Sequence, residues 1–505
     1  MLNRLFLLLF CLGFALAGGG AGAAENRPNI VFLIADDLGY GDVGCFGQTK
    51  IRTPNIDQIA KDGMRLTQCY AGNAVCAPSR CVLMTGLHPG HAQVRNNREV
   101  QPEGQHPLQA GTVTLPRLLK QLGYVTGGFG KWGLGGPDSD GRPTRQGIDR
   151  WFGYNCQRVA HSHYPAYLWD NEQKLLLKNP QNPALTGHEK LPAGADPNDE
   201  RSYSGLAGTQ FGMDVITEQA IQFVKDNKDR PFFLYYPTII PHAAFQVPDD
   251  SLAEYKDKFP EEKPYLLNYT ANRTPRATFA AMVTRMDGHI GQIVAAVREA
   301  GVFDNTIFVF TSDNGPVFDS LSGERVDFFN STGGFRGRKG SLYEAGIHEP
   351  TIVSWKGHIA PGTTADRVCG FEDWIPTLLE LAGVKDATPQ TIDGISFAPT
   401  LLGQSQPPRP FLYREFAAGG GQQSVRIGDW KGIRQGMLPA TAKVKKAKTQ
   451  GGLSMHVELY NLKSDPHETT DVSAQHPDIV AQIEKLMRDQ HTPNPDFPFP
   501  PLDRV

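Results

Sequence analysis

Short and almost continuous apolar segments recur along the chain. Five of them are long enough for one strand each, at residues 29–37, 124–133, 231–240, 305–315 and 350–355. A strand that is apolar on both faces is typical of a parallel sheet with helices on both sides. A strand with one solvent-exposed face would instead alternate apolar with polar residues. The pattern therefore predicts five strands buried inside a layered fold.

Between these strands the apolar residues take helical spacing. The helix candidates are residues 53–66, 114–124, 277–301 and 373–384. In the first of them, Thr53 is a plausible N-cap and Pro54 stands at the first helical position, where a missing N–H costs nothing. Alternating strands and helices predict an α/β fold with a mostly parallel sheet flanked by helices.

The pattern changes after about residue 402. The segment "GQSQPPRP" is typical of a linker, and strand-like segments follow at residues 411–416, 422–436 and 456–462, with a last helix at 476–490. We interpret residues 25–402 as the main domain and residues 403–505 as a smaller α+β domain built on an antiparallel sheet.

The first 24 residues are typical of a secretory signal peptide. Arg4 precedes an apolar run, and small residues follow, with cleavage expected near Ala23 or Ala24. The run is short for a membrane span, and no later stretch is long and apolar enough for one. We therefore expect an exported protein, periplasmic or secreted, that does not span a membrane.

Composition narrows the class of partner. The formal net charge is −3, with 40% hydrophobic and 20% charged residues. Because no basic surplus exists to neutralise a phosphate backbone, nucleic acid is excluded as the main partner. The seven cysteines show no CxxC spacing, so neither a zinc cluster nor a cysteine framework is predicted. Disulfide formation by Cys69, Cys81 or Cys156 stays open.

Polar residues follow the predicted strands at their carboxyl ends, where open parallel sheets bind ligands. The residues are Asp36, Asp37, Lys131, His242, Asp313 and Asn314. Three carboxylates on one rim would repel one another unless a cation lay between them. Oxygen ligands favour Ca²⁺ or Mg²⁺ over zinc. Each pair alone is commonly a turn or a cap, but together they predict a metal site.

The stretch "NAVCAPSRCVLMTG" adds a candidate reactive residue. Pro78 suits the first turn of a helix, which places Cys76 at its N-terminal end. There the helix dipole and free N–H groups stabilise negative charge, and Arg80 adds a positive charge within one turn. Cys76 is then either an activated thiolate nucleophile or an inert buried cysteine. The adjacent arginine and the metal rim favour a reactive role.

Cys76-Ala77-Pro78-Ser79-Arg80, followed by "MTG", resembles the signature of the type I sulfatases, whose cysteine is oxidised after translation to Cα-formylglycine. Segments in the same order cover nearly the whole chain, among them "PNIVFLIADDLGYGDVGCFG", "FGKWGLG", "TIFVFTSDNGP" and "GRKGSLYEAGIHEP". The resemblance implies an alkaline-phosphatase-like α/β fold with a smaller C-terminal sheet domain. It implies an exported sulfatase that hydrolyses sulfate esters, with a sulfated carbohydrate as the expected substrate, and a formylglycine-generating maturation enzyme as a partner.

The resemblance also implies roles for single residues. Formylglycine at position 76 completes a site for one Ca²⁺, whose other ligands match Asp36, Asp37, Asp313 and Asn314. Arg80 orients the formylglycine, and sulfate or leaving-group contacts fall to Lys131, His242 and Lys339. The hydrated aldehyde offers one hydroxyl to attack sulfur, forming a covalent sulfo-enzyme intermediate, and a second to expel sulfate.

One position departs from the family pattern. The family often reads Gly-Lys-Trp-His around Lys131, but the fourth residue here is Gly133. His161 or His163, in "CQRVAHSHYPAYLW", is expected to enter the pocket instead, and we favour His161. His289 is interpreted as a structural residue of its helix.

Substrate contacts are expected close to the reactive helix. The segment "GHAQVRNN" follows that helix directly and brings three polar candidates, His91, Arg95 and Asn97; His163 is a fourth. Polar and aromatic residues there suit a sugar sulfate, and they equally suit the packing of loops.

Three other functions compete with a carbohydrate sulfatase. They are an arylsulfatase of broad specificity, a phosphate or phosphonate ester hydrolase of the same superfamily, and a calcium-stabilised secreted binding protein without activity. A Ser or Thr nucleophile and the ligands of a second metal, which phosphatases commonly carry, are not found in the sequence. A binding protein would have no need for Cys76, Arg80, Lys131, His242 and Lys339 together.

Overall fold

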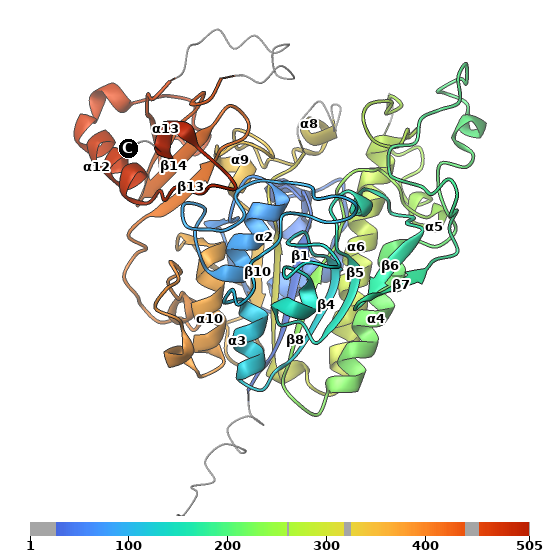
Figure 1. Ribbon diagram of the computed structural model, residues 1–505, viewed down its shortest axis with the longest axis horizontal. Helices are drawn as coiled ribbons and strands as arrows, with labels where there is room; N and C mark the ends of the chain where they lie inside the picture. Colours follow the sequence, from blue (N-terminus) through green and yellow to red (C-terminus); the bar gives the residue numbers. More distant parts are fainter. Residues whose placement is uncertain (1–26, 260–261, 318–324, 440–453, 504–505) are drawn as a thin grey trace, which may run out of the picture.

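A computed structural model of the chain describes residues 27–259, 262–317, 325–439 and 454–503 (Figure 1). A ten-stranded sheet has the order β11-β2-β10-β9-β1-β8-β4-β5-β6-β7, and β9, β1, β8, β4 and β5 run parallel. A two-stranded sheet joins β3 to β12, and a four-stranded antiparallel sheet has the order β13-β14-β15-β16. The expected α/β fold with a smaller antiparallel sheet is confirmed. The expected signal peptide lies outside the described residues.

The strands are β1 (Asn29–Ala35), β2 (Met64–Leu66), β3 (Cys69–Tyr70), β4 (Val125–Lys131), β5 (Arg150–Tyr154), β6 (Tyr167–Asp170), β7 (Gln173–Leu176), β8 (Phe232–Pro237), β9 (Thr306–Ser312), β10 (Thr351–Ser354), β11 (Thr363–Ala365), β12 (Cys369–Gly370), β13 (Leu412–Phe416), β14 (Gln422–Ile427), β15 (Trp430–Arg434) and β16 (Glu458–Asn461).

The helices are α1 (Pro54–Lys61), α2 (Cys76–Thr85), α3 (Leu115–Gln121), α4 (Gly212–Asn227), α5 (Asp249–Leu252), α6 (Pro275–Glu299), α8 (Arg325–Phe329), α9 (Glu344–Ile347), α10 (Trp374–Leu381), α11 (Ala398–Leu401), α12 (Pro477–Asp489) and α13 (Pro500–Asp503). None of the described helices is both long and apolar enough to span a membrane.

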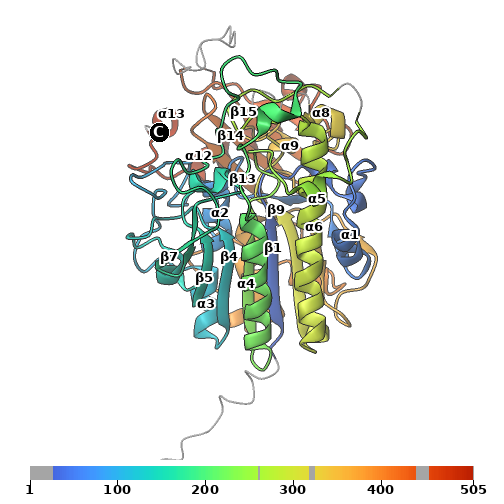
Figure 2. The same ribbon diagram turned by 90° about the vertical axis from the view of Figure 1, so that its right-hand side faces the viewer.

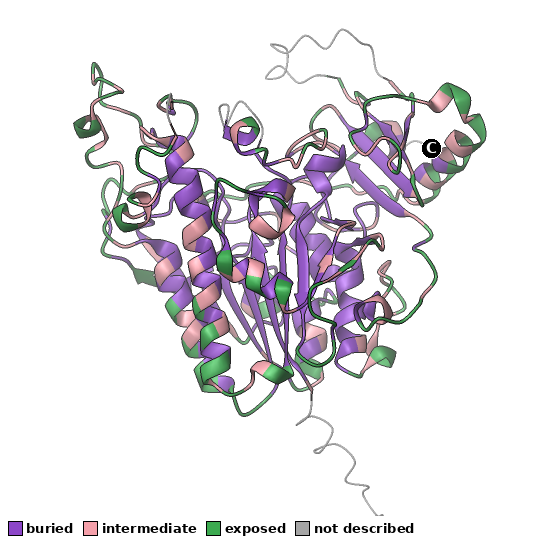
Figure 3. Ribbon diagram, turned by 180° about the vertical axis from the view of Figure 1, so that it is seen from behind, coloured by how far each residue is buried: buried purple, intermediate pink, exposed green. Residues whose placement is uncertain are grey.

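Strand β1 shows why the central segments read as continuously apolar. Val31 and Leu33 pack into one core with residues of α1, α4 and α6, whereas Ile30 and Phe32 pack into a second core with α2, α3 and α10. Helices therefore cover both faces of the sheet (Figures 1 and 2), and its central strands, such as β1, β8 and β9, are buried along their length (Figure 3). Burial on both faces removes the alternation of apolar and polar residues that a strand with one solvent-exposed face would show.

Helices α4 and α6 pack side by side on one face of the sheet (Figure 2). His289 of α6 bonds through Nε2 to Asp214 Oδ1 of α4 at 2.8 Å, and Arg285 pairs with the same carboxylate. This contact between the two helices is the structural role expected for His289.

The prediction of one helix over residues 53–66 is wrong for the C-terminal end of that segment. Helix α1 stops at Lys61, and residues 64–66 form strand β2 between β10 and β11. Thr53 stands at the N-cap position, but its side chain makes no cap bond. The Asp287 carboxylate instead accepts the backbone N–H groups of Asn55 and Ile56. Tertiary partners thus replaced the local signals at both ends of this element.

The four-stranded sheet carries the C-terminal part of the fold, with α12 packed on β14 and β15 (Figure 1). All four strands follow residue 402, where we propose the boundary between the two domains. Helix α11 ends at Leu401 and β13 begins at Leu412, so the Pro-rich segment lies between the two.

Candidate active site

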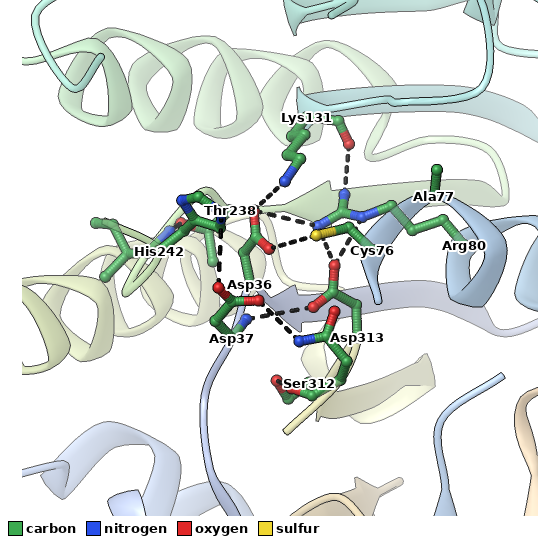
Figure 4. A network of polar contacts seen from close by, with 12 residues as sticks. Asp36, Asp37, Cys76, Ala77, Arg80, Lys131, Thr238, His242, Ser312 and Asp313 are labelled. Atoms are coloured by element: carbon green, nitrogen blue, oxygen red, sulfur yellow. Dashed lines mark hydrogen bonds and ion pairs between the residues drawn. The ribbon is translucent and has the colours of Figure 1, made fainter. Parts of the chain in front are cut away.

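The expected rim residues lie together at the carboxyl ends of β1, β4, β8 and β9 (Figure 4). Asp36 and Asp37 follow β1 directly, Asp313 follows β9, and Lys131 is the last residue of β4. The N–H of Asp313 donates to the carbonyl oxygen of Ala35 at 3.0 Å, which fixes the two strand ends side by side. Because these strands are parallel, their polar ends meet at one edge of the sheet.

Asp37 turns back toward this cluster with a left-handed backbone, at φ 65°. A non-glycine residue keeps such a conformation only where its surroundings hold it. Here Asn314 Nδ2 donates to Asp37 Oδ1 at 2.7 Å, and the Asp37 N–H donates to Asp313 Oδ1 at 3.3 Å. The Oδ1 atom of Asn314 is buried and has no hydrogen-bond partner in the described parts of the chain. A buried acceptor without a donor is a suitable ligand for a cation.

Cys76 is the first residue of α2, and its side chain is in the centre of the cluster (Figure 4). Its thiol donates to Asp36 Oδ1 at 3.4 Å, and Lys339 Nζ donates to the sulfur at 3.4 Å. Asp36, Asp37, Cys76 and His242 each offer an atom within 4.8 Å of the others. A helix N-terminus, two carboxylates and a lysine therefore meet at this one side chain.

Arg80 is fully buried one turn after Cys76 and ties α2 to two strands. Its Nε and Nη2 atoms contact Asp313 Oδ2 at 2.9 and 2.8 Å, and Nη1 donates to the carbonyl oxygen of Lys131 at 2.6 Å. Burial, followed by the charge of Asp36, nevertheless raises the pKa of Asp313 to about 6. The arginine alone does not relieve the crowding of the carboxylates.

Two lysines pair with the carboxylates that follow β1. Lys131 Nζ bonds to Asp36 Oδ2, and Lys339 Nζ donates to both oxygens of Asp37 at 2.6 and 2.8 Å. Burial lowers the pKa of each lysine, but the neighbouring carboxylates outweigh it and raise both pKa values. For the Asp36 carboxyl, burial acts in the opposite direction and raises the pKa. The surrounding positive charges, Lys131 first, outweigh burial and hold the pKa of Asp36 below its usual value. Asp36 and both lysines are therefore charged at neutral pH.

The thiol of Cys76 is protonated in this environment. Burial, followed by the charge of Asp36, raises its pKa to about 12 against the opposing charges of Lys131 and Lys339. A protonated thiol is a weak nucleophile, since the thiolate is the reactive form. The site thus argues against the activated thiolate that the sequence left open.

His242 faces Asp37 from the loop after β8. Its Nδ1–H donates to the carbonyl oxygen of Ala243, so Nε2 carries the lone pair and lies 3.6 Å from Asp37 Oδ2. Burial and the positive charge of Lys339 hold the pKa of His242 well below its usual value. The ring of His161 stacks on it, with centroids 5.2 Å apart and planes at 7°. His242 is thus a neutral imidazole within the cluster.

The structure separates His161 from His163. His161 is partly exposed and lies directly against His242. His163 is fully buried, donates from Nε2 to the carbonyl oxygen of His242 at 3.0 Å, and stacks on Phe211. His163 therefore supports the backbone that carries His242, whereas His161 lies beside the cluster.

Two residues that the sequence did not single out, His188 and Tyr269, extend this wall of rings. The Nδ1–H of His188 donates to the carbonyl oxygen of Asn268 at 3.0 Å, which leaves Nε2 to accept from Nδ1 of His161 at 3.0 Å. This order leaves the lone pair of His161 on Nε2. Tyr269 stacks on His188 and meets His161 edge-on at 5.3 Å. Both residues lie in irregular loops, where no periodicity could have marked them.

Gln157, beside Gly133, is a third residue that the sequence did not single out. The backbone at Gly133 has φ 80°, and a Cβ added there would lie 3.1 Å from Gln157 Nε2. That Nε2 atom is buried and has no hydrogen-bond partner among the residues that the structure describes. The amide of Gln157 thus lies beside the position where the family often has a histidine.

The three substrate-contact candidates that follow the reactive helix lie in different places in the structure. Asn97 reaches α2, where its Oδ1 accepts the N–H of Ala77 at 3.1 Å. The structure does not bring His91 and Arg95 into the cluster. His91 pairs with Asp393 at 2.9 Å, and buried Arg95 bonds to Glu415 and Thr492. Asp393 holds the segment within the main domain, and Glu415 and Thr492 hold it against the C-terminal part of the fold. This is the loop packing that the sequence left as an alternative.

Comparisons with known proteins agree with one another. The sulfatase family model matches residues 28–384, and a model for the C-terminal region of N-sulphoglucosamine sulphohydrolase matches residues 335–492. Arylsulfatase A of Homo sapiens is 32% identical over 92% of this chain and 88% of its own length. An N-acetylgalactosamine-6-O-sulfatase of Bacteroides thetaiotaomicron is 29% identical over 93% of this chain and 94% of its own length. A solved structure from work on the metabolism of multiple glycosaminoglycans by Bacteroides thetaiotaomicron matches with a TM-score of 0.71 and 27% identity. The match covers 92% of this chain and 99% of the chain in that structure.

Proposed function

Since the chain belongs to the sulfatase family and is a sulfuric ester hydrolase, we propose that it is an exported sulfatase of sulfated carbohydrates that works through formylglycine at position 76. The observation that carries this proposal is the position of Cys76. Its buried thiol, with a raised pKa, lies at the start of α2 between Asp36 and Lys339. Once oxidised to the aldehyde and hydrated, this side chain supplies a hydroxyl nucleophile where a thiol would be inert.

The residues around Cys76 fit a hard cation, and we propose Ca²⁺. The four ligands that the family pattern assigns, Asp36, Asp37, Asp313 and Asn314, all offer oxygen atoms. Oxygen ligands are the ones that Ca²⁺ prefers over thiolate or imidazole. The unpartnered Oδ1 of Asn314 and the raised pKa of Asp313 are both relieved by a cation between them. Bound there, Ca²⁺ would withdraw charge from a sulfate oxygen.

The basic side chains then have distinct roles. Arg80 is fixed by Asp313 and by the carbonyl oxygen of Lys131, so it holds residue 76 in place. Lys131 and Lys339 place positive charge near residue 76 and stabilise negative charge on the sulfate oxygens. Lys339, which is charged, supplies the proton for the departing alcohol, because the one ring proton of neutral His242 is held by the carbonyl oxygen of Ala243.

We propose that His161 takes the place of the missing family histidine as a base. Its partner His188 holds the proton of His161 on Nδ1 and leaves Nε2 free to accept one. Burial, followed by the neighbouring His242 ring and the positive charge of Lys131, keeps the pKa of His161 well below 6.5, so the ring is neutral at neutral pH. Asn97, Gln157 and Tyr269 are the neighbouring candidates for substrate contacts.

Replacing His161 with alanine is expected to lower kcat by about 10²-fold and to change KM little, because a base acts on the reaction more than on binding. A neutral base is lost as pH falls through its own pKa. Since that pKa lies below 6.5, the wild-type kcat should hold from neutral pH to below pH 6.5 and then fall. The measurement is kcat against pH for both proteins. His358→Ala, at an exposed histidine that stacks on Trp355, is the control. An unchanged kcat in the His161 variant would refute this role.

The sugar preference is supported by the relatives and by the ring-lined wall beside His242. Aromatic rings commonly line ligand pockets, and Tyr269, which stacks on His188 and meets His242 edge-on, brings a ring and a hydroxyl group to this wall. The test is a panel of sulfated mono- and oligosaccharides, an aryl sulfate, and a phosphate and a phosphonate monoester. We expect kcat/KM for one sugar sulfate to exceed that for the aryl sulfate and the phosphorus esters by at least about 10²-fold. Equal or faster turnover of the aryl sulfate would favour a broad arylsulfatase, and faster turnover of a phosphorus ester would favour the other hydrolase class.

Export and maturation complete the proposal. The leader expected at residues 1–24 would direct the chain to the periplasm or to the outside of the cell. A formylglycine-generating enzyme would act on Cys76 within the Cys-Ala-Pro-Ser-Arg segment. Because α2 begins at Cys76 and the residue is buried, this modification must precede folding of the site.

A further inference from the structure

Cys69 and Cys369 lie opposite each other in the two-stranded sheet of β3 and β12. They are register partners in this parallel pair, and the Cys369 N–H donates to the carbonyl oxygen of Gln68 at 3.1 Å. Neighbouring strands lie about 4.8 Å apart. That spacing is within the roughly 4.4–6.8 Å between Cα atoms that a disulfide requires.

The two thiols also point to the same side. Cys69 and Cys369 belong to one core cluster, on the face of the sheet covered by α2, α3 and α10. Tyr70, the next residue of β3, belongs to a different cluster, and its hydroxyl donates to Glu344 at 2.7 Å. This is the alternation of a strand, so register partners share a face. The thiol of Cys69, together with burial, raises the pKa of Cys369 well above its usual value.

We propose that Cys69 and Cys369, both thiols in the structure, form a disulfide in the exported protein. The proposal rests on export to an oxidising compartment. Both thiols lose a hydrogen and are oxidised as the S–S bond forms. A disulfide of an oxidoreductase or of glutathione is reduced to two thiols and takes up the two protons and two electrons.

The remaining buried cysteines have other neighbours. Cys81 of α2 lies beside the backbone N–H groups of Val94 and Gln93. Cys156 donates to the carbonyl oxygen of Gly104 at 3.6 Å. Of the cysteines left open by the sequence, Cys69 is thus the one with a thiol opposite it.

The cross-link would join parts of the chain that are 300 positions apart. Strand β3 leads through residues 71–75 to Cys76, and β12 leads directly into the turn Phe371–Asp373 and α10. Closing so long a loop removes conformational freedom from the unfolded chain. It would also fix the base of the segment that carries the reactive residue.

The test begins with the full chain expressed in a bacterium, with cells quenched in acid and thiols alkylated in denaturant. Peptide mapping without reductant should show one linked pair, containing Cys69 and Cys369, two hydrogen atoms lighter than the separate peptides. The mass of the chain reports separately whether the leader was removed. A processed chain in which both cysteines are alkylated would overturn the proposal. If the leader is retained, export has failed, and the purified protein equilibrated with reduced and oxidised glutathione decides the question by the same map.

Thermal unfolding gives a second measurement. Reductant should lower the Tm of the oxidised wild-type protein by about 5 °C. The variants Cys69→Ala and Cys369→Ala should lose this response, and Cys156→Ala should keep it. A linked pair that joins other cysteines, or an equal response to reductant in all variants, would contradict the assignment.

Discussion

Replacing Cys76 with alanine is expected to abolish sulfate ester hydrolysis, with a loss of kcat of roughly 10⁴-fold or more. The reason is that the reactive hydroxyl would be built on this side chain, and no other nucleophile in the cluster has the same position. Asp36, Asp37 and Asp313 are held by Lys131, Lys339 and Arg80. Sulfate release is measured with the best substrate of the panel, and mass analysis of wild-type protein from a maturing host should show an aldehyde at position 76.

The variant Cys76→Ser separates the two halves of the proposed reaction. A serine hydroxyl can attack sulfur once, but it has no second hydroxyl on the same carbon with which to expel sulfate. We therefore expect at most one equivalent of alcohol to be released and the sulfate to stay on the protein. A burst followed by steady turnover would show that a plain hydroxyl suffices and would sink the formylglycine mechanism.

Cys81→Ala is the matched control for both substitutions. Cys81 is a buried cysteine of the same helix, and it lies against the backbone at Val94 and not in the cluster. Its replacement should lower the free energy of unfolding by about 1 kcal/mol for the lost buried atoms and leave kcat unchanged. Full activity in Cys76→Ala, or equal losses in both variants, would contradict a special role for Cys76.

The central strands could be predicted because burial on both faces makes them continuously apolar. Residues 29–35 and 306–312 are of this kind, and both form strands. The strand at residues 64–66 could not be predicted, because three residues are too few to show a hydrophobic periodicity. Only pairing with β10 and β11 makes these residues a strand. Strand β7 is exposed along its length and depends on its hairpin partner β6. Such short edge elements are decided by tertiary contacts.

The cluster could be predicted in its main members because strand ends in a parallel sheet converge. Asp36, Asp313 and Lys131 needed only the strand assignment to be placed together. His188 and Gln157 could not be found in this way, since loop positions depend on packing that leaves no periodic trace. The choice between His161 and His163 needed the structure for the same reason. They are two residues apart, and only their contacts show which ring lies against His242.

Removing the cation from the proposed Ca²⁺ site is expected to lower kcat/KM by at least about 10³-fold, and added Ca²⁺ should restore it. Without the ion, three carboxylates face Arg80, Lys131 and Lys339, so the cluster has no net charge to attract an anion. With the ion, the same cluster is positive where a sulfate monoester, itself negative, must bind. Loss of the ion should therefore raise KM as well as lower kcat.

Binding can be measured without turnover. Ca²⁺ at 100 times its Kd should add about 2.7 kcal/mol to the free energy of unfolding, seen as a rise in Tm. Asp36→Asn should lose most of this rise, because it removes a ligand charge beside Lys131. Asp42→Asn is the control, since Asp42 is equally buried close by but accepts the N–H of Gly39 outside the cluster. If Asp36→Asn responds to Ca²⁺ as strongly as Asp42→Asn does, the carboxylates do not hold the ion. In that case their crowding must be relieved by protonation of Asp313, whose pKa of about 6 would then make activity fall as pH rises above that value.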